Sequence, residues 1–535
     1  MKKSTILEVL LVTFLFLFSI YMWSLPIKNN PLPYGEVDAA HHYCIADYMT
    51  ESDNIEELYK PSFLYYQYAY RSLLGPHYLS PKSPYTPNFF LNQAISQIIG
   101  GNRPLSYYLF LSILCVSIIL SSYFLMRKLF GIIPAFLTSL LIMASKIDIM
   151  TFIMGQYVIL VSFACLPLIL YSYYKYTSSF LDKKPKQIYL YIMALLMVTQ
   201  YFNHYQSLID TFMILLIFSI FLVIKEKKIP FNFKHAVIAT IIFLVLTGPF
   251  INRSWQSVKN AEVYYTEDTE DISDDWEDLF KWYTSGYDVI AVNQSVFSYK
   301  DMHGYWTLPL LILGSLFLSL RRKRKDLLLL SWIIALYLIL HFDLFLGMGA
   351  GRLFRSVNNV PYIFYSLVAV GFMGLLSFIK VPPKTKRYIT YVLIGIFILL
   401  FFNFNFKSSF EILDRGYAPP YSINNFQYDA ARWMNDNLKE DDIIYNKGTL
   451  IQKTRRFIRC VSHRFMIANE EQKEWLIDTY KDDNFDTQYY FIDYSELSGL
   501  GMNKEVEELQ HWEKENLINS TLVYNNQFVR IYDVR

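Results

Sequence analysis

Gly35-Glu36-Val37-Asp38-Ala39-Ala40-His41-His42 follows the first apolar run of the chain after about ten residues. That run begins near Thr5 and is long enough to cross a bilayer, which takes about 20 mainly apolar residues. Two carboxylates and two imidazoles therefore stand where the chain leaves the membrane. Ionisable groups are costly there, so we expect this stretch to serve a function.

The rest of the sequence repeats the pattern of long apolar segments separated by basic clusters. The 535 residues contain about eleven such segments between Thr5 and Asn403. No small-residue cleavage pattern follows the first segment, so we expect it to be retained rather than removed as a signal peptide. The sequence predicts a polytopic α-helical membrane protein with about eleven transmembrane helices.

The basic clusters predict the orientation. If the N-terminus is cytoplasmic, alternation of the spans places five further clusters on the same side. These are Arg127-Lys128, Lys183-Lys184-Lys186, Lys225 to Lys228, Arg321 to Lys325 and Lys380 to Arg387. The other side receives the loops 26–103 and 252–303, and everything after Asn403. We therefore expect a multi-pass protein of the plasma membrane with an extracytoplasmic C-terminus.

After Asn403 the sequence becomes typical of a soluble domain. Apolar spacing predicts helices over 428–438 and 505–517, with short strands at 441–445, 489–494 and 521–524. We expect a transmembrane domain over 1–403 and a small extracytoplasmic α/β domain over 404–535. The latter has no glycine-rich phosphate loop and no metal-spaced Cys/His set, which favours an accessory role.

Charge and cysteine content add two expectations. The net charge of +2 is too small to indicate a nucleic-acid partner. Cys115 and Cys165 lie within predicted spans and are typical of small packing residues. Cys44 and Cys460 are both predicted to be extracytoplasmic, so a disulfide between them is allowed, although nothing in their spacing requires it.

If a helix begins at Asp38, the spacing of the polar residues predicts which of them share a face. Helical spacing then places Asp38, His41 and His42 on one face, while Asp47 points the other way. That face would direct a carboxylate and two imidazoles toward a cavity at the bilayer surface. The alternative is that Asp38 only caps the helix and the histidines are interfacial.

With its acidic residue just after the first span, the chain resembles the GT-C superfamily of polyprenyl-phosphate-dependent glycosyltransferases. This superfamily includes protein mannosyltransferases, aminoarabinose transferases and the catalytic subunit of oligosaccharyltransferase. The likeness covers the topology of the membrane part, but as a motif it is limited to Glu36–His42. It implies transfer of a sugar from a lipid-linked phosphate donor to an extracytoplasmic acceptor, which is a lipid-linked glycan, a surface polymer or a protein.

The resemblance also implies roles for individual residues. Asp38 matches the acidic residue of the family's first loop, as a general base or a group that positions the acceptor, and Glu36 is the second choice. His41 and His42 would bind the donor phosphate, orient the acceptor or tune Asp38. Asp148 stands where some members carry a second acidic residue.

A metal site is left open by these residues. If Asp38 and Asp148 converge, their oxygens would suit Mg²⁺ or Mn²⁺. The alternative for Asp148 is a local ion pair with Lys146. The family's full acidic pattern is not evident here, which favours a reaction without metal.

The donor phosphate calls for cationic partners near the outer surface. Arg352 and Arg355 precede a predicted span, and arginine's planar fork suits phosphate oxygens. The alternative is that these arginines only reach toward lipid headgroups. Arg253 and His204 are further candidates on the same argument.

One departure from the family's motifs restricts the expected substrate. The Trp-Trp-Asp-Tyr-Gly motif of the oligosaccharyltransferase catalytic subunit is absent, so transfer of a single sugar fits better than transfer of a whole oligosaccharide to asparagine.

Two other classes of function compete with a glycosyltransferase. They are a transporter or flippase for a lipid-linked saccharide, and a non-catalytic membrane assembly protein. The sequence shows no convincing internal repeat of the kind common in transporters.

Overall fold

The computed structural model describes residues 3–29, 31–35, 37–50, 88–153, 155–265, 287–288, 296–297, 302–340, 356–414, 423–439, 442–468 and 487–535. The chain divides into two compact units. The first comprises Met1–Leu25, Leu111–Phe152 and Gln156–Asp414. The second comprises Pro26–Phe110, Ile153–Gly155 and Arg415–Arg535.

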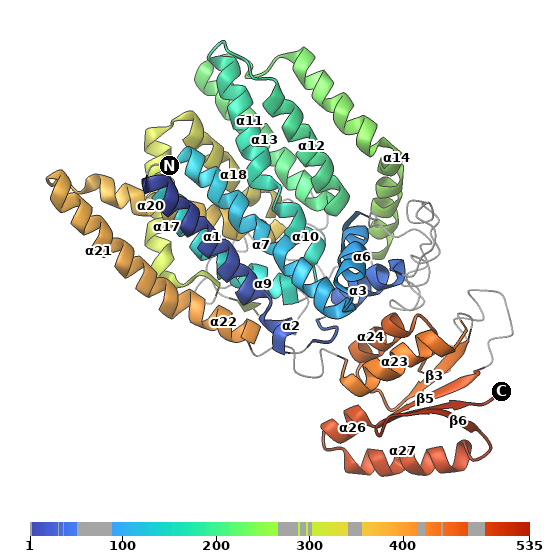
Figure 1. Cartoon of the computed structure of the whole chain (residues 1–535). Helices are drawn as coiled ribbons and strands as arrows, with labels where there is room; N and C mark the ends of the chain where they lie inside the picture. The colour runs from blue at the N-terminus through green and yellow to red at the C-terminus, as the bar shows by residue number, and fades with distance from the viewer. Residues whose placement is uncertain are drawn as a thin grey trace. The chain divides into compact units, whose positions relative to one another are not determined.

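Long apolar helices build the first unit (Figure 1). They are α1 (Lys3–Trp23), α7 (Arg103–Leu129, from Leu111 onward), α8 (Ile132–Met143), α9 (Lys146–Ile153), α10 (Tyr157–Phe163), α11 (Leu166–Leu181), α12 (Ile188–Asn203), α13 (Tyr205–Glu226), α14 (Phe233–Tyr265), α17 (Leu308–Arg321), α18 (Arg324–Leu340), α20 (Val360–Phe378), α21 (Pro383–Phe401) and α22 (Lys407–Asp414). The strands β1 (Tyr287–Asp288) and β2 (Val296–Phe297) pair antiparallel, η1 (Tyr305–Thr307) precedes α17, and a π-helical turn, η3 (Phe402–Phe406), joins α21 to α22.

Six helical segments in the described residues are long and apolar enough to cross a membrane. They are Arg103–Leu129, Ile132–Ile153, Tyr157–Leu181, Gln206–Glu226, Ser356–Phe378 and Pro383–Asp414. Shorter apolar helices are found at Glu8–Trp23, Ile188–Asn203, Phe233–Gly248 and Tyr305–Arg321. The chain is therefore an integral membrane protein.

Close helix packing in this unit depends on glycine. A Cβ atom at Gly314 would lie 2.1 Å from the carbonyl oxygen of Leu367, and one at Gly371 would lie 1.9 Å from that of Leu310. The backbones of α17 and α20 therefore approach each other more closely than a larger residue would permit. Small residues serve the same purpose at many helix contacts in membranes.

Basic connections meet at one end of the helices. Arg324 pairs with Asp182 at 2.8 Å and with Glu226 at 2.9 Å, which joins the ends of α11 and α13 to the start of α18. Lys325 donates to the carbonyl oxygen of Leu129 at the end of α7. Arg127, near the end of α7, pairs with the Glu8 carboxylate of α1. Several of the basic clusters found in the sequence thus lie side by side.

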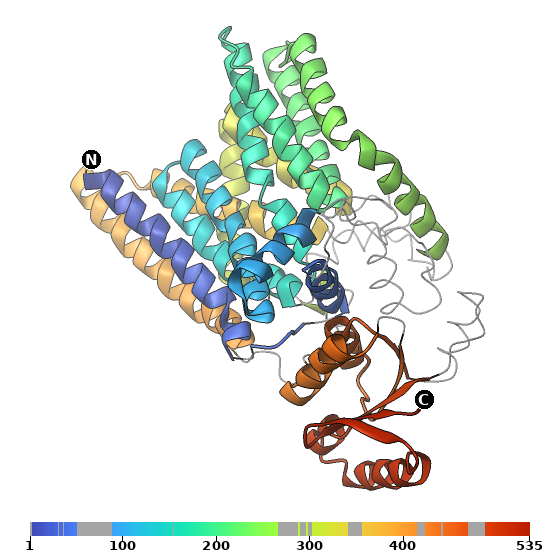
Figure 2. The same ribbon diagram turned by 45° about the vertical axis from the view of Figure 1, so that its right-hand side comes forward.

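The second unit contains a five-stranded mixed sheet in the order β4-β3-β5-β7-β6. Its strands are β3 (Ile443–Lys447), β4 (Phe465–Ile467), β5 (Tyr489–Asp493), β6 (Thr521–Asn525) and β7 (Val529–Asp533). β3 runs parallel to β4 and β5, whereas β7 runs antiparallel to β5 and β6. Figures 1 and 2 show α23 (Asn425–Asn437) and α24 (Gln452–Ser462) on one face, with α26 (Ser495–Gly499) and α27 (Asn503–Asn516) on the other.

Helices within residues 26–110 belong to this second unit. They are α2 (Leu25–Asn29, from Pro26 onward), α3 (Val37–Met49), α6 (Asn88–Gly100) and the first turns of α7, up to Phe110. α3 packs against both α6 and α24. The part of the chain that carries the polar stretch is therefore placed by residues from both ends of the sequence.

One sequence expectation about a loop needs correction. A loop was expected from residue 252, but α14 continues as far as Tyr265. Residues 146–148 form the first turn of α9. α9 follows α8 after a break of two residues at Ala144 and Ser145, so the apolar segment 132–153 bends rather than ends. His204 is the residue at which α12 ends and α13 begins.

Candidate functional site

The start of α3 is held by neighbouring backbone and aromatic rings. Tyr34 stacks on Tyr108 with ring centroids 4.1 Å apart. The Tyr108 hydroxyl donates to the Tyr34 carbonyl oxygen at 2.8 Å and accepts from the Tyr34 backbone N–H at 3.0 Å. Gly155, with φ +82°, lies so close that a Cβ atom there would be 2.1 Å from the backbone nitrogen of Ala39. The first turn of α3 is thus fixed on two sides.

Asp38 lies in this first turn, since α3 begins at Val37. The helix therefore begins one residue before the expected start at Asp38, and Asp38 is not its cap, although a carboxylate in the first turn still interacts favourably with the helix dipole. The side chains of Asp38 and His41, and the whole of Glu36, lie outside the described residues. Their predicted roles stay predictions.

The side chain of His42 lies in the described part of the structure, and it is buried. Its side chain is 1% exposed, and its ring packs against Phe89 and Phe90 of α6, with centroids 5.8 Å and 5.4 Å away. These contacts show that His42 lies on the face of α3 that packs against α6. The ring therefore helps to orient α3 against α6.

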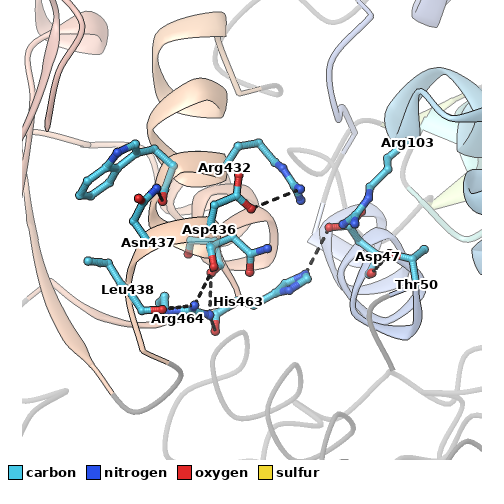
Figure 3. Close-up of polar contacts among 12 residues, drawn as sticks. Asp47, Thr50, Arg103, Arg432, Asp436, Asn437, Leu438, His463 and Arg464 are labelled. Carbon is cyan, nitrogen blue, oxygen red and sulfur yellow. Dashed lines mark hydrogen bonds and ion pairs between the residues drawn. The ribbon is translucent and has the colours of Figure 1, made fainter. Parts of the chain in front are cut away.

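Asp47, which the sequence placed on the other side of α3, is the centre of a buried polar cluster (Figure 3). Its Oδ1 lies 3.4 Å from Nη1 of Arg103 and its Oδ2 lies 3.2 Å from Nε2 of His463. The Tyr43 hydroxyl also donates to Oδ1 at 3.4 Å. Burial and, secondly, the Asp47 charge raise the pKa of Tyr43, and the same two causes raise the pKa of Tyr428 to about 12. Both phenols therefore stay neutral.

The residues after α24 hold His463 in place. His463 adopts a left-handed conformation with φ +50° at the end of α24. Next to it, Arg464 donates to the carbonyl oxygens of Asn435 and Leu438 at the end of α23 (Figure 3). A cation at the C-terminus of a helix satisfies carbonyl groups that lack partners within the helix. These hydrogen bonds tie the segment after α24 to the end of α23, and they thereby fix the imidazole that meets Asp47.

In the first unit, Asp148 is fully buried and accepts a hydrogen bond from the Tyr362 hydroxyl at 2.8 Å. Its backbone N–H donates to the Ser145 hydroxyl at 3.3 Å. In the described part of the chain, no three His, Cys, Asp or Glu residues are grouped as metal ligands. The Asp38 side chain lies outside that part, so a metal shared by Asp38 and Asp148 stays a prediction.

Asp210 is a buried carboxylate that the sequence reading missed. It accepts from the Ser356 hydroxyl at 2.7 Å and from the Asn359 amide at 3.2 Å, and the Asn359 side chain accepts from Trp332 Nε1 at 2.9 Å. The network joins α13 and α18 to the turn that precedes α20. An aspartate within an apolar span was the signal that would have found it.

The predicted phosphate-binding residues are only partly described. His204 is 6% exposed and stands at the break between α12 and α13, and its carbonyl oxygen accepts from Ser207 at 2.7 Å. Arg253 lies in α14, but its side chain is outside the described residues. Arg352 and Arg355 lie outside them entirely.

A mainly apolar groove of about 410 Å³ lies between helices of the first unit. It is lined by Ser117, Leu120, Ser121 and Phe124 of α7, Val161, Ala164, Cys165 and Leu168 from α10, α11 and their junction, and Thr199 and Asn203 of α12. All of these residues belong to apolar helices of the first unit or to the junctions between them. A groove of this composition suits a hydrocarbon chain.

Comparison of the chain with known proteins gives its family and its fold. A family model described as "Family of unknown function (DUF6541)" matches residues 2–448. A comparison with curated proteins finds no significant match.

Solved structures resemble this one over nearly its whole length. ArnT from Cupriavidus metallidurans in the apo state has a TM-score of 0.55 at 11% identity, with 99% of this chain and 97% of that chain covered. ArnT bound to undecaprenyl phosphate gives 0.51 at 11% identity, with 99% and 98% covered. The oligosaccharyltransferase AglB from Archaeoglobus fulgidus, in complex with an inhibitory peptide and a dolichol-phosphate, gives 0.51 at 13% identity, with 100% and 75% covered. The GT-C resemblance seen in the sequence is confirmed at the level of the fold.

Proposed function

Because the chain belongs to the DUF6541 family and has a GT-C fold, we propose that it is a membrane glycosyltransferase. It would move a sugar from a polyprenyl-phosphate-linked donor to an extracytoplasmic acceptor. The observation that carries this proposal is the match to nearly the full length of ArnT, a protein solved with undecaprenyl phosphate bound. The acceptor is a lipid-linked glycan, a surface polymer or a protein.

Asp38 is the proposed base. It lies in a helical turn that Gly155 and the Tyr34–Tyr108 pair hold in place, and a catalytic group must be positioned within hydrogen-bond reach of the proton that it removes. Glu36 is the second candidate, and His41 would assist by binding phosphate or acceptor. The burial of His42 against two phenylalanines supports an orienting role for that ring.

The donor would be held through its phosphate and its lipid. Arg352, Arg355 and Arg253 are the proposed phosphate partners, together with His204 at the break between α12 and α13. The groove lined by Ala164 and Thr199 has the apolar character that an isoprenoid chain needs.

The proposed topology has eleven helical segments that cross the membrane. Beyond the six segments that are long and apolar enough to cross a membrane, these are α1, α12, α14, α17 and α18. The meeting of Arg127, Lys225, Arg324 and Lys325 near one end supports a cytoplasmic location for that end. Under this arrangement the N-terminus is cytoplasmic, the α/β domain that follows the last span is extracytoplasmic, and the protein resides in the plasma membrane.

Glycan analysis of cells tests the proposal. Mass spectrometry of lipid-linked and surface glycans, with and without the gene, should show one species that is lost or shortened in the deletion strain. The wild-type gene should restore that species and an Asp38→Asn gene should not, at equal protein levels in the membrane. Unaltered glycans in the deletion strain would instead favour the transporter or assembly role.

A further inference from the structure

Two cysteines face each other where α3 packs on α24. Cys44 of α3 is 1% exposed and Cys460 of α24 is fully buried. The Cys460 thiol donates to the carbonyl oxygen of Ala40 at 3.3 Å, across a separation of 420 residues in sequence. Ala40 lies one helical turn before Cys44 and on the same face of α3. The Cys460 side chain is therefore directed at the turn that carries Cys44.

The register of the two helices brings the thiols together. Asp47 of α3 meets His463, the residue that ends α24, at 3.2 Å. Three residues earlier on each helix stand Cys44 and Cys460. Residues three or four apart share a helix face, so Ala40 and Asp47 lie on either side of Cys44 on the face of α3 that meets Cys460 and His463. The Cys44 side chain interacts directly with the Cys460 thiol.

Two other uses for these thiols fit less well. A nucleophilic cysteine needs an exposed site that stabilises the thiolate, whereas burial raises the pKa of Cys460 and the neighbouring Cys44 raises it further. A metal site needs more ligands, and the described residues contain no group of three. Two adjoining cysteines outside the cytoplasm are the usual setting of a structural disulfide.

We infer that Cys44 and Cys460 form a disulfide that ties the helix of the first external loop to α24. The inference uses the extracytoplasmic placement proposed above, but it does not use the transferase activity. Both cysteines are reduced in the structure. Because both are buried once the unit is folded, the bond would form during folding.

The oxidant would be the disulfide of an extracytoplasmic thiol oxidase. One cysteine thiolate attacks that disulfide to give a mixed disulfide, and the second thiolate then displaces the oxidant's sulfur. The two cysteines lose two protons and two electrons, and the oxidant leaves as a dithiol. The new bond would act together with the contact between Asp47 and His463, one turn further along both helices.

Peptide mapping of the full-length protein tests this directly. The protein is extracted in detergent with N-ethylmaleimide, denatured and digested with trypsin without reductant. The expected product joins residues 29–71 to residues 460–464, at two hydrogens below the summed mass, and it separates on reduction. Cys115 and Cys165, which lie in the apolar helices, serve as controls and should carry only maleimide. Maleimide on both Cys44 and Cys460 in all molecules would overturn the inference.

A double-mutant cycle, measured as melting temperatures, adds a second test. Cys44→Ser, Cys460→Ser and the double variant should all lower the apparent melting temperature by the same amount, about 5 °C, because each removes one shared bond. Reductant should destabilise the wild type and leave the variants unchanged. Additive losses would indicate two independent packing residues and would contradict the inference. Protease accessibility of a C-terminal tag on intact cells reports the topology separately, so an external tag with free thiols would overturn the disulfide alone.

Discussion

The two ends of α3 are held in place by different physical means. At its start, a glycine backbone and a pair of stacked tyrosines fix the turn that carries Asp38. At its end, Asp47 is held by Arg103 and His463. Close packing acts through shape, whereas ion pairs act through charge and depend on which groups are titrated. Changes at the start should therefore affect catalysis through geometry, and changes at the end should affect stability.

The largest effect is expected from Asp38→Asn. Loss of a general base lowers the rate of transfer roughly 10²- to 10⁴-fold, while the amide keeps the size of the side chain and should leave the melting temperature unchanged. The measurement is the initial rate of sugar transfer by purified protein. Glu36→Gln is the matched control and should lose far less. The reverse pattern would move the role of base to Glu36.

A second test distorts the start of α3 from outside. Gly155→Ala places a Cβ where Ala39 already lies, at a residue with φ +82°, and should cost about 3 kcal/mol together with most of the activity. Gly101→Ala is the matched control in the same unit, because its φ is +71° but nothing lies within 4 Å. Thermal stability and the activity of the folded protein should separate the two. Equal losses would mean that backbone strain alone, rather than contact with α3, explains the effect.

At the other end, Asp47→Ala removes a buried carboxyl group that contacts Arg103, His463 and Tyr43. It should lower stability by about 3 kcal/mol, because these buried polar groups lose a shared partner. Asp436→Ala is the control, since its pair with Arg432 spans 3.8 Å and its side chain is 62% exposed, so a loss of about 0.5 kcal/mol is expected. Chemical or thermal unfolding in detergent provides the values. Activity of the surviving folded Asp47→Ala protein should stay above that of Asp38→Asn.

A substitution in the apolar groove, away from α3, tests whether binding of the lipid can be separated from the two ends of α3. Ala164→Trp fills the apolar groove and should raise KM for a lipid-linked donor about tenfold, with little change in kcat. Leu195→Trp on α12 is the control, since Leu195 is 49% exposed and does not line the groove. A donor with a shortened lipid should be insensitive to both variants. If Ala164→Trp leaves KM unchanged, the groove is not the lipid site.

The smallest effect is expected from removing divalent cations. If the start of α3 works through protein side chains alone, a chelator should leave the rate of transfer unchanged within about twofold. A loss that Mn²⁺ or Mg²⁺ restores would instead support a metal held by Asp38 and Asp148. The same assay on Asp148→Asn would then show whether Asp148 is a ligand.

Much of the helical part could be predicted from the sequence, because apolar length and basic clusters are local signals. The C-terminal elements were also predictable where periodicity was clear: the helix expected over 428–438 overlaps α23, and the strand expected over 489–494 overlaps β5. α24, β4 and β7 were missed. The arginines of α24 mask its apolar face, and β4 and β7 are short strands whose pairing depends on distant neighbours.

The site was less predictable because its contacts are long-range. Helical spacing placed Asp47 opposite His42, but nothing in the spacing could show that α24 would supply His463. Gly155 carries no local sign that its backbone meets Ala39. Asp210 did carry a signal, since an aspartate inside an apolar span requires partners, and that signal was not followed.

Turnover of a lipid-linked sugar by the purified protein tests the central claim most directly. Wild-type protein in liposomes is given a panel of polyprenyl-phosphate-linked sugars together with extracts that contain glycan and protein acceptors. The account predicts that one donor is consumed, that polyprenyl phosphate is released and that the sugar appears on an acceptor, all at rates that Asp38→Asn abolishes. Movement of an intact donor across the bilayer without cleavage, at equal rates in the wild type and Asp38→Asn, would contradict it.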